Sequence, residues 1–396
     1  MHGVRVLIAP DSFGSSLTAD EAARAIAGAW RSTAPQDEVT ECPLSDGGPG
    51  FVAVLHAALG GELVAVTVTS PVGVPVPAVI LRVGTTAYVE SAQAIGLPLV
   101  PAELRDPTRT SSRGAGELVA AALDAGARTV VVGLGGSATN DGGAGALVAL
   151  ARALGLDGPS ELLAAGGGSL GSVTADDLRG LRDLRDRLRD VELVVATDVD
   201  VPLLGLHGAS AGFAPQKGAT PEQAQDLERA LGHFAHAATA ALGDAVRPDL
   251  LAGARATSPT SRLTAAPGAG AAGGLGFGLT LLGARLVPGS LFVADAVGLD
   301  ALIADHDVVV TGEGRFDWQS LHGKVVSEVA SRALPHAVPT VVVAGEVLVG
   351  RRELSAAGIT AAYAVGENPE QVAAALAAPA ESLAARAARV ARTWSR

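Results

Sequence analysis

The stretch "TVVVGLGGSATNDGGAGALVALARALG" (residues 129–155) joins an apolar strand to a helix through a glycine-rich loop. The strand portion is a continuous apolar run, which is typical of a strand covered on both faces of a parallel sheet. Glycines in such a loop let backbone N–H groups approach an anion, and the start of the following helix adds a favourable dipole. The stretch therefore predicts an α/β unit with a phosphate-binding loop.

The same loop partly fits a dinucleotide-binding fingerprint. "GLGGSA" matches G-x-G-x-x-[GA], and Asp157 follows roughly 20 residues later, as the fingerprint requires. The fingerprint should open the helix at once, whereas "TNDGG" intervenes here and adds Thr139, Asn140 and Asp141. These groups favour a phosphate or Mg²⁺-linked site. An NAD-dependent oxidoreductase acting on a small hydroxy acid stays open as the alternative.

Apolar runs of strand length recur along the chain, and helical segments separate many of them. They cover residues 4–10, 63–70, 78–83, 86–92, 129–135, 192–198, 307–314, 340–346 and 360–365. This alternation predicts an α/β fold with two domains and the active site in the cleft between them. We expect a discontinuous Rossmann-like parallel-sheet domain from residues 1–45 and 285–396. An inserted second α/β domain, residues 46–284, would carry the glycine-rich loop. We also expect one amphipathic helix over 177–192.

Composition narrows the function classes. The 396 residues carry a net charge of −12, which argues against non-specific binding to nucleic acid. The single cysteine, Cys42, excludes an internal disulfide framework and suits a reducing compartment. The N-terminus has no basic region followed by a signal-length apolar run, and the most apolar long segment, 62–84, is interrupted by prolines. We therefore expect a cytoplasmic protein without a membrane span.

Lysine is nearly absent from the chain. Of 29 basic residues only Lys217 and Lys324 are lysines, and both lie beside glycine, in "PQKGA" and "LHGKV". Where arginine has otherwise replaced lysine, a remaining lysine indicates a place that needs a compact ammonium group, as a phosphate site does. The competing interpretation is that both are leftover surface residues.

Charge also gathers where two further strands end. "DVVVTGEGRFDWQSLHGKV" places Glu313, Arg315 and Asp317 after an apolar run but lacks the spacing of a P-loop. Such strand ends are typical ligand sites in open α/β sheets. "VVATDVD" places Asp198 at another strand end, where it could serve as a general base or a metal ligand. The glycines of "PGAGAAGGLGFGL" suit either a nucleotide site or close helix packing.

In this order, the motifs resemble those of the type 1 bacterial glycerate kinases. The matching segments cover nearly the whole chain and are "APDSFGSSLTA", "PLSDGGPG", "VESAQAIGLPLV", "TSSRGAGEL", "GLGGSATNDGGAGA", "TDVDVPLLG", "GASAGFAPQKGA", "GAGAAGGLGFGL" and "VVTGEGRFDWQSLHGKV". The resemblance implies phosphorylation of D-glycerate, usually at the 2-hydroxyl, with ATP and Mg²⁺. It implies a small-molecule hydroxy-acid substrate and leaves a homodimer open.

The resemblance also implies roles for individual residues. Asp198, as base or metal-linked carboxylate, and Lys217 would be catalytic. The nucleotide would be bound by Gly135, Gly136, Ser137, Thr139, Asn140, Asp141, Gly270 and Gly273. The substrate would be bound by Asp11, Ser12, Asp46, Gly47, Glu313, Arg315, Asp317 and Lys324. Such groups suffice chemically, because phosphoryl transfer depends mainly on positioning and charge neutralisation.

The chain departs from the family in two of these loops. The family usually reads "DSFKGSL" and "DGGEG", whereas this chain reads "DSFGSSL" and "DGGPG". Gly14 therefore replaces a lysine, Ser15 a glycine and Pro49 a glutamate. The loop around Asp11 then has no cation of its own, so we expect positive charge from Lys217, Lys324 and Arg315. A different small hydroxy acid as substrate is the further alternative.

Overall fold

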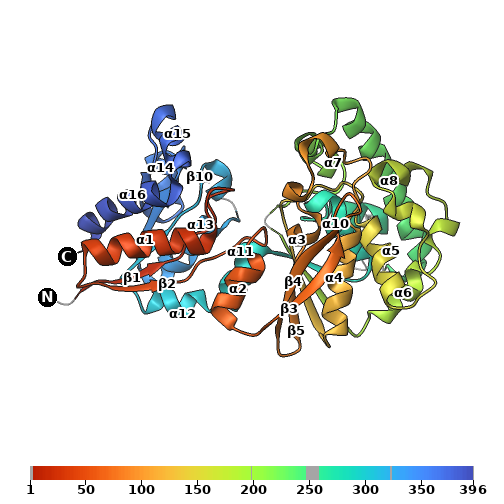
Figure 1. The fold of residues 1–396 in the computed structure, drawn as a ribbon, viewed down its shortest axis with the longest axis horizontal. Helices are drawn as coiled ribbons and strands as arrows, with labels where there is room; N and C mark the ends of the chain where they lie inside the picture. The colour runs from red at the N-terminus through yellow and green to blue at the C-terminus, as the bar shows by residue number, and fades with distance from the viewer. Residues whose placement is uncertain (1–2, 198, 247–257, 322, 396) are drawn as a thin grey trace. The chain divides into compact units, whose positions relative to one another are not determined.

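The computed structural model describes residues 3–197, 199–246, 258–321 and 323–395, and its fold is α/β, as the sequence predicts (Figure 1). The chain divides into two compact units. Unit 1 consists of residues 1–46, 53–60 and 288–396, and unit 2 of residues 47–52 and 61–287. The sequence predicts domain boundaries at 45/46 and 284/285. A division into compact units does not show which parts of the chain fold independently, so these boundaries stay a prediction.

Unit 1 is built around a five-stranded parallel sheet in the order β13-β11-β9-β1-β2. β1 hydrogen-bonds to β2 on one side and to β9 on the other, so both ends of the chain contribute to one sheet. The strands are β1 (Arg5–Ile8), β2 (Glu38–Glu41), β9 (Val308–Thr311), β11 (Thr340–Ala344) and β13 (Ile359–Ala364). A separate two-stranded parallel pair joins β10 (Arg315–Phe316) to β12 (Glu346–Val347).

Helices cover both faces of this sheet. Val341 and Val343 pack in one core cluster with residues of α1 (Ala19–Thr33) and α16 (Pro379–Trp394), which lie side by side in Figure 1. Val342 and Ala344, which point the opposite way, pack with residues of α13 (Val325–Ala333). This three-layer arrangement is Rossmann-like. The other helices are α11 (Gly289–Ala296), α12 (Leu299–Ala304), α14 (Arg351–Ala356) and α15 (Pro369–Ala377).

Unit 2 contains a six-stranded sheet in the order β3-β4-β5-β6-β7-β8. β3, β4 and β5 pair antiparallel, whereas β5, β6 and β7 pair parallel. The strands are β3 (Glu62–Thr69), β4 (Pro75–Val83), β5 (Thr86–Glu90), β6 (Thr129–Leu134), β7 (Glu192–Thr197) and β8 (Arg285–Pro288). The helices are α3 (Ala92–Ile95), α4 (Arg113–Asp124), α5 (Ala144–Ala153), α6 (Leu181–Arg187), α7 (Ala209–Phe213), α8 (Pro221–Leu242), α9 (Pro259–Ala265) and α10 (Ala271–Leu281). One further helix, α2 (Phe51–Leu59), contains residues assigned to both units.

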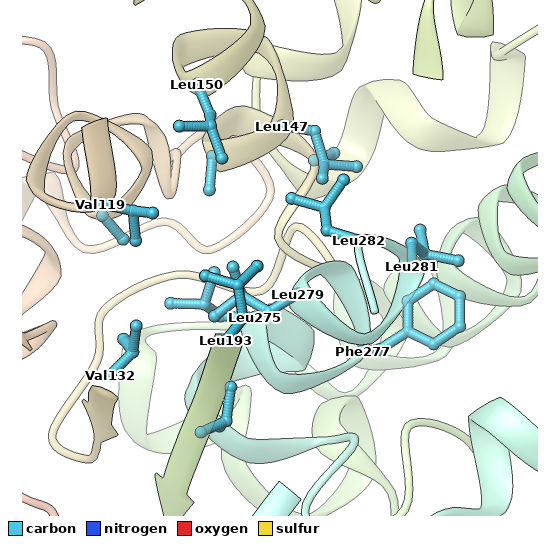
Figure 2. Packing of buried hydrophobic residues seen from close by; sticks show 14 of the residues in the cluster. Val119, Val132, Leu147, Leu150, Leu193, Leu275, Phe277, Leu279, Leu281 and Leu282 are labelled. Carbon is cyan, nitrogen blue, oxygen red and sulfur yellow. The ribbon is translucent and has the colours of Figure 1, made fainter. Parts of the chain in front are cut away.

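The core of unit 2 holds β6 and the helix that follows it in place. Figure 2 shows Val132 of β6, Val119 of α4 and Leu147 of α5 near Leu275 and Leu279 of α10, all of them buried. The apolar run 129–134 is therefore covered on both faces, which is why it has no polar alternation. The glycine-rich loop therefore begins at the end of a buried strand.

Every strand predicted from an apolar run is present, within a few residues at each end. The helix predicted over 177–192 is wrong as a single element. Gly180 adopts a φ of 76° and separates a short 3₁₀ turn, Asp176–Leu178, from α6. Leu178, Leu181 and Leu184 are nevertheless buried, as the pattern predicts. No helix within the described ranges combines the length and apolarity needed to cross a membrane.

Candidate functional site

The glycine-rich loop of unit 2 runs from the end of β6 to the start of α5. Gly142 and Gly143 adopt φ values of 63° and 77°, a left-handed conformation that glycine tolerates best, and they turn the chain into the helix. Asp141 lies within this turn and is fully buried. Its carboxylate accepts hydrogen bonds from the N–H of Gly143 at 3.1 Å and of Gly145 at 3.3 Å. Asp141 therefore stabilises the first turn of α5.

Asp141 also connects this loop to the segment before α4. Its Oδ2 accepts hydrogen bonds from the backbone N–H of Ser112 at 2.7 Å and from the Ser112 hydroxyl at 2.8 Å. Burial raises the pKa of Asp141, while these bonds and those of Gly143 and Gly145 oppose the rise. The sequence interpretation placed Asp141 in the nucleotide-binding set. The structure places its carboxylate among protein donors inside unit 2.

Lys217 lies beside the loop and is buried, with 3% of its surface exposed. It closes a short 3₁₀ turn, Pro215–Lys217, that follows α7. Its Nζ donates to the Ser137 hydroxyl at 2.9 Å and to the Thr139 carbonyl oxygen at 2.6 Å. Burial lowers the pKa of Lys217 to about 7, and the nearby Asp141 carboxylate opposes that shift. Lys217 is thus hydrogen-bonded to two residues of the loop that the sequence predicts to bind the nucleotide. The catalytic role of Lys217 stays a prediction.

Asn140 is buried in the same loop and is held from α7. Its Nδ2 donates to the Ser210 hydroxyl at 3.0 Å. Its Oδ1 is buried and finds no hydrogen-bond donor among the described residues. A buried acceptor without a donor costs free energy, so this oxygen is available to a donor that arrives with a ligand or water.

Gly135 and Gly136 form the accessible part of the loop, Gly136 being exposed. The segment 47–49 packs beside them: a Cβ on Gly135 would come 2.6 Å from the Cα of Gly48, and one on Gly136 would come 3.2 Å from the Pro49 ring. A side chain on Gly47, another predicted binding residue, would meet the Ala196 carbonyl oxygen of β7 at 2.6 Å. The segment 47–49 therefore closely approaches the glycine-rich loop at Gly135 and Gly136 and β7 at Gly47, all positions without a side chain.

The second glycine-rich segment packs against the first. A Cβ on Gly273 would lie 1.8 Å from the Thr139 carbonyl oxygen, and one on Gly270 would lie 2.2 Å from the Pro202 carbonyl oxygen. The chain between them leaves helical geometry, with Ala272 at a φ of 51°. Close backbone packing thus accounts for these glycines. Direct nucleotide contact by Gly270 and Gly273 stays a prediction.

Unit 1 gathers acidic side chains where three neighbouring parallel strands end. Asp11 follows β1, Asp46 follows β2 and Glu313 follows β9. Because β9, β1 and β2 are adjacent in the sheet, these carboxylates come from one edge of it. Backbone bonds hold the loops together: the N–H of Asp11 donates to the Gly312 carbonyl at 2.8 Å, and that of Gly345 to the Glu313 carbonyl at 3.1 Å. We refer to Asp11, Asp46, Glu313 and Lys324 as the strand-end cluster.

Two carboxyl groups of the strand-end cluster, those of Asp11 and Glu313, have raised pKa values. Burial raises the pKa of Glu313 to about 7, a hydrogen bond from Ser320 and the charge of Lys324 oppose the rise, and Asp317 and Asp46 add to it. Burial also raises the pKa of Asp11 well above its ordinary range, and Asp46 adds to that shift. Lys324, at the start of α13, is the cation that acts on both carboxyl groups. A carboxyl group whose pKa lies near 7 at the end of a strand, as that of Glu313 does, is characteristic of functional sites.

The remaining predicted residues of unit 1 lie at the margin of this cluster. The N–H of Ser12 donates to Asp11 Oδ1 at 2.6 Å. Arg315 is exposed and lies 3.8 Å from Asp317, whose Oδ1 accepts the N–H of Gln319 at 2.9 Å. Gly14 is exposed at a φ of 59° with open space where a side chain would project.

The described residues contain no group of three or more His, Cys, Asp or Glu side chains placed to hold a metal ion. The residue predicted as metal ligand and base, Asp198, lies outside the described residues, as does His322. Mg²⁺ commonly uses only one or two carboxylates together with the phosphates of a nucleotide. The predicted Mg²⁺ site at Asp198 therefore stays a prediction.

Sequence reasoning overlooked three hydroxyl groups that support the predicted residues. They are Ser112 at Asp141, Ser210 at Asn140 and Ser320 at Glu313. All three are buried. Each falls inside a motif that carried the family resemblance, "TSSRGAGEL", "GASAGFAPQKGA" and "EGRFDWQSLHGKV". The motifs therefore contained the signal, but a serine in a sequence does not reveal which side chain it will meet.

Comparison with known proteins covers almost the entire chain. The family model described as the glycerate kinase family matches residues 6–395. A glycerate kinase of Bacillus subtilis (strain 168) is 42% identical over 365 residues, which is 91% of this chain and 90% of the relative. A glycerate 2-kinase of Escherichia coli (strain K12) is 41% identical over 365 residues, with the same coverage of both chains.

The fold has a solved counterpart. A crystal structure described as a glycerate kinase 2 from Salmonella typhimurium LT2 superposes with a TM-score of 0.74 at 38% sequence identity. The superposition covers 98% of this chain and 98% of that one. The similarity thus extends over both sheets and both candidate regions.

Proposed function

The chain belongs to the glycerate kinase family, and from this membership we propose that it transfers the γ-phosphoryl group of Mg·ATP to the 2-hydroxyl of D-glycerate. One observation of the site supports the proposal in addition to the family match. The buried Lys217 donates hydrogen bonds to a glycine-rich loop that joins a strand to a helix. That combination suits an anion with several phosphates. The 2-position is proposed by analogy with the Escherichia coli relative, which is named for it.

On this proposal the nucleotide phosphates bind against the backbone of Gly135 and of the exposed Gly136. Lys217 supplies positive charge behind the loop, and the anion in turn favours its protonated form. Asp198, which directly follows β7, binds the Mg²⁺ that accompanies ATP. Ser137, Thr139, Asn140 and Asp141 act mainly by holding the loop in shape, because their side chains are buried among protein groups.

We assign the binding of the acidic substrate to residues other than those that bind the nucleotide. Lys324 and Arg315 attract the carboxylate of glycerate, while Asp11, Ser12, Asp46 and Glu313 interact with its hydroxyl groups. Hydroxyl groups donate hydrogen bonds to carboxylates, so a dihydroxy acid matches a cluster that offers both signs of charge. A cytoplasmic location stays a prediction of the sequence, and a homodimer stays open.

Product analysis tests the proposal. The protein is incubated with D-glycerate and Mg·ATP, and the product is examined by proton-coupled ³¹P NMR. A phosphate on the 2-oxygen couples to one carbon-bound proton and gives a doublet, which we expect. A triplet would indicate a phosphate on the 3-oxygen. It would contradict phosphorylation at the 2-hydroxyl but would still support kinase activity on glycerate. No phosphomonoester at all would contradict the proposed function.

A further inference from the structure

We propose that Glu313 is the general base that accepts the proton of the attacking hydroxyl, and this assignment rests on the proposed kinase function. In the proposed step the O–H proton moves to Glu313 Oε1 as the hydroxyl oxygen bonds to the γ-phosphorus. The bond from that phosphorus to the bridging oxygen breaks, and ADP leaves with the electron pair. Glu313 then releases the proton to water.

The first argument is that one carboxylate oxygen of Glu313 has no hydrogen-bond donor among the described residues. The residue is 8% exposed, and its Oε1 is buried without a hydrogen-bond donor among the described residues. Ser320 bonds the same carboxyl group and so helps to fix its orientation. A buried, unused acceptor is costly unless a ligand supplies the donor. A substrate hydroxyl is such a donor.

The second argument is that the neighbouring carboxylates already have bonds to protein groups. Asp11 accepts from the N–H of Ser12 at 2.6 Å. Asp317 accepts from the N–H of Gln319 and lies 3.8 Å from Arg315. Among these residues Glu313 alone has a buried carboxylate oxygen without a donor in the described chain.

The third argument is that the backbone of Glu313 is rigidly held. Gly312 has no room for a side chain, because a Cβ would lie 1.9 Å from the Val343 carbonyl oxygen. A Cβ on Gly314 would lie 3.0 Å from the backbone of Phe13. The Glu313 carbonyl accepts the N–H of Gly345 at 3.1 Å. A base held this firmly at a strand end is already positioned for proton transfer.

The charges around Glu313 suit a base that works at neutral pH. Asp46 comes from the loop after β2, Asp11 from the loop after β1, Asp317 from the turn after β10 and Lys324 from the start of α13. Burial and the carboxylates raise the pKa of Glu313 to about 7 although Lys324 opposes the rise. A general base is most effective when its pKa lies near the working pH.

The test compares the wild-type protein with Glu313→Gln, Glu313→Asp and the control Glu367→Gln. Glu367 is an exposed residue of unit 1 that pairs with Arg386. We expect Glu313→Gln to lower kcat by about 100-fold or more with little change in KM for D-glycerate. Glu313→Asp keeps a carboxylate and should lose less. Glu367→Gln should match the wild type.

The pH profile of kcat/KM distinguishes a base from a merely structural residue. The wild type should lose activity below a midpoint near pH 7, and Glu313→Gln should lack that acidic limb. A Gln variant that keeps the wild-type rate and profile overturns the assignment and leaves the proposed kinase function intact. If the variants do not fold, the pH profile of the wild type is sufficient for the test. A wild-type kcat/KM profile without a midpoint between about pH 6 and 8 would overturn the assignment of Glu313 as the base.

Absence of wild-type turnover with D-glycerate would instead contradict the proposed function. The base assignment would then be judged by ¹³C NMR titration of protein labelled at glutamate carboxyl carbons. We expect the Glu313 signal, identified by its loss in Glu313→Gln, to titrate near pH 7 rather than near the ordinary 4.5. A midpoint near 4.5 would overturn it.

Discussion

At the scale of single residues, Lys217 is the feature that the sequence indicated most sharply. Lysine scarcity predicted a functional ammonium group, and the structure places that group inside unit 2 at the glycine-rich loop. Composition could not reveal that Lys217 would be buried, because burial depends on α7 and the loop meeting in space. Nor could composition reveal which neighbouring groups accept hydrogen bonds from Lys217.

Replacing Lys217 by Met should change how stability depends on pH. The pKa of Lys217 falls from 10.5 to about 7 on folding, so between these values the unfolded chain binds more protons than the folded one. The stability of the wild type relative to Lys217→Met should therefore rise with pH, by about 2–3 kcal/mol between pH 7 and 9. Urea unfolding at the two pH values measures this. Equal changes in both proteins would contradict the burial argument.

The same substitution tests catalysis. If Lys217 supplies charge to the phosphate loop, Lys217→Met should lower kcat by about 100-fold or more, as should Asp198→Asn, while the folded circular dichroism spectrum is retained. Steady-state assays with Mg·ATP measure this effect. Rates near those of the wild type would remove the catalytic role from whichever residue was changed.

Glu313→Gln should have the opposite dependence of stability on pH. The pKa of Glu313 rises from 4.5 to about 7 on folding, so the carboxyl stabilises the fold below pH 4.5 relative to its ionised form, and that contribution is lost as pH rises through 7. Gln cannot ionise, so the variant should gain stability relative to the wild type by about 3 kcal/mol between pH 5 and 8. Chemical denaturation at both pH values checks this. A constant difference would mean that Glu313 titrates normally.

At the scale of elements, the two glycine-rich segments depend on each other. Gly273→Ala places a methyl group 1.8 Å from the Thr139 carbonyl oxygen at a φ of 68° and should cost about 3 kcal/mol or more. The control is Gly28→Ala, in the exposed interior of α1 with nothing within 4 Å, which should stabilise by about 0.5–1 kcal/mol. Thermal unfolding compares them. Equal effects would mean that the segments do not pack as described.

The loop after β1 tests where the family's missing lysine would act. Gly14→Lys meets open space but retains a left-handed φ of 59°, so it should cost only about 1–2 kcal/mol. We expect a larger effect on KM for the hydroxy acid than on folding, because the side chain adds a cation to the loop that carries Asp11. Steady-state kinetics measures KM. An unchanged KM would mean that this loop does not face the substrate.

The elements themselves were largely predictable, for a physical reason. Runs such as 129–134 and 308–311 are buried on both faces, so their apolar character is continuous and visible in the sequence. β2, with the sequence "EVTE", was missed because it is short and partly exposed at the sheet edge. The break at Gly180 was missed because leucine spacing continues across it. Tertiary packing, which the leucine spacing does not reveal, decides whether the helix continues through Gly180.

At the scale of the whole molecule, the alternative oxidoreductase makes a separate prediction about ligand-linked stability. A ligand present at about 100 times its Kd stabilises the fold by about 2.7 kcal/mol. Mg·ATP should therefore raise Tm by several degrees, whereas NAD at equal concentration should not. Differential scanning fluorimetry measures both. A shift with NAD alone would favour the dinucleotide interpretation of "GLGGSA".

The most direct test of the account is ADP release measured with and without D-glycerate. The wild-type protein is given Mg·ATP, and ADP is coupled to a spectroscopic signal. We predict ADP formation that depends on D-glycerate, with a turnover number of about 1–100 s⁻¹ as is typical of kinases. ADP release no faster with D-glycerate than with Mg·ATP alone would contradict the central claim that this chain phosphorylates glycerate.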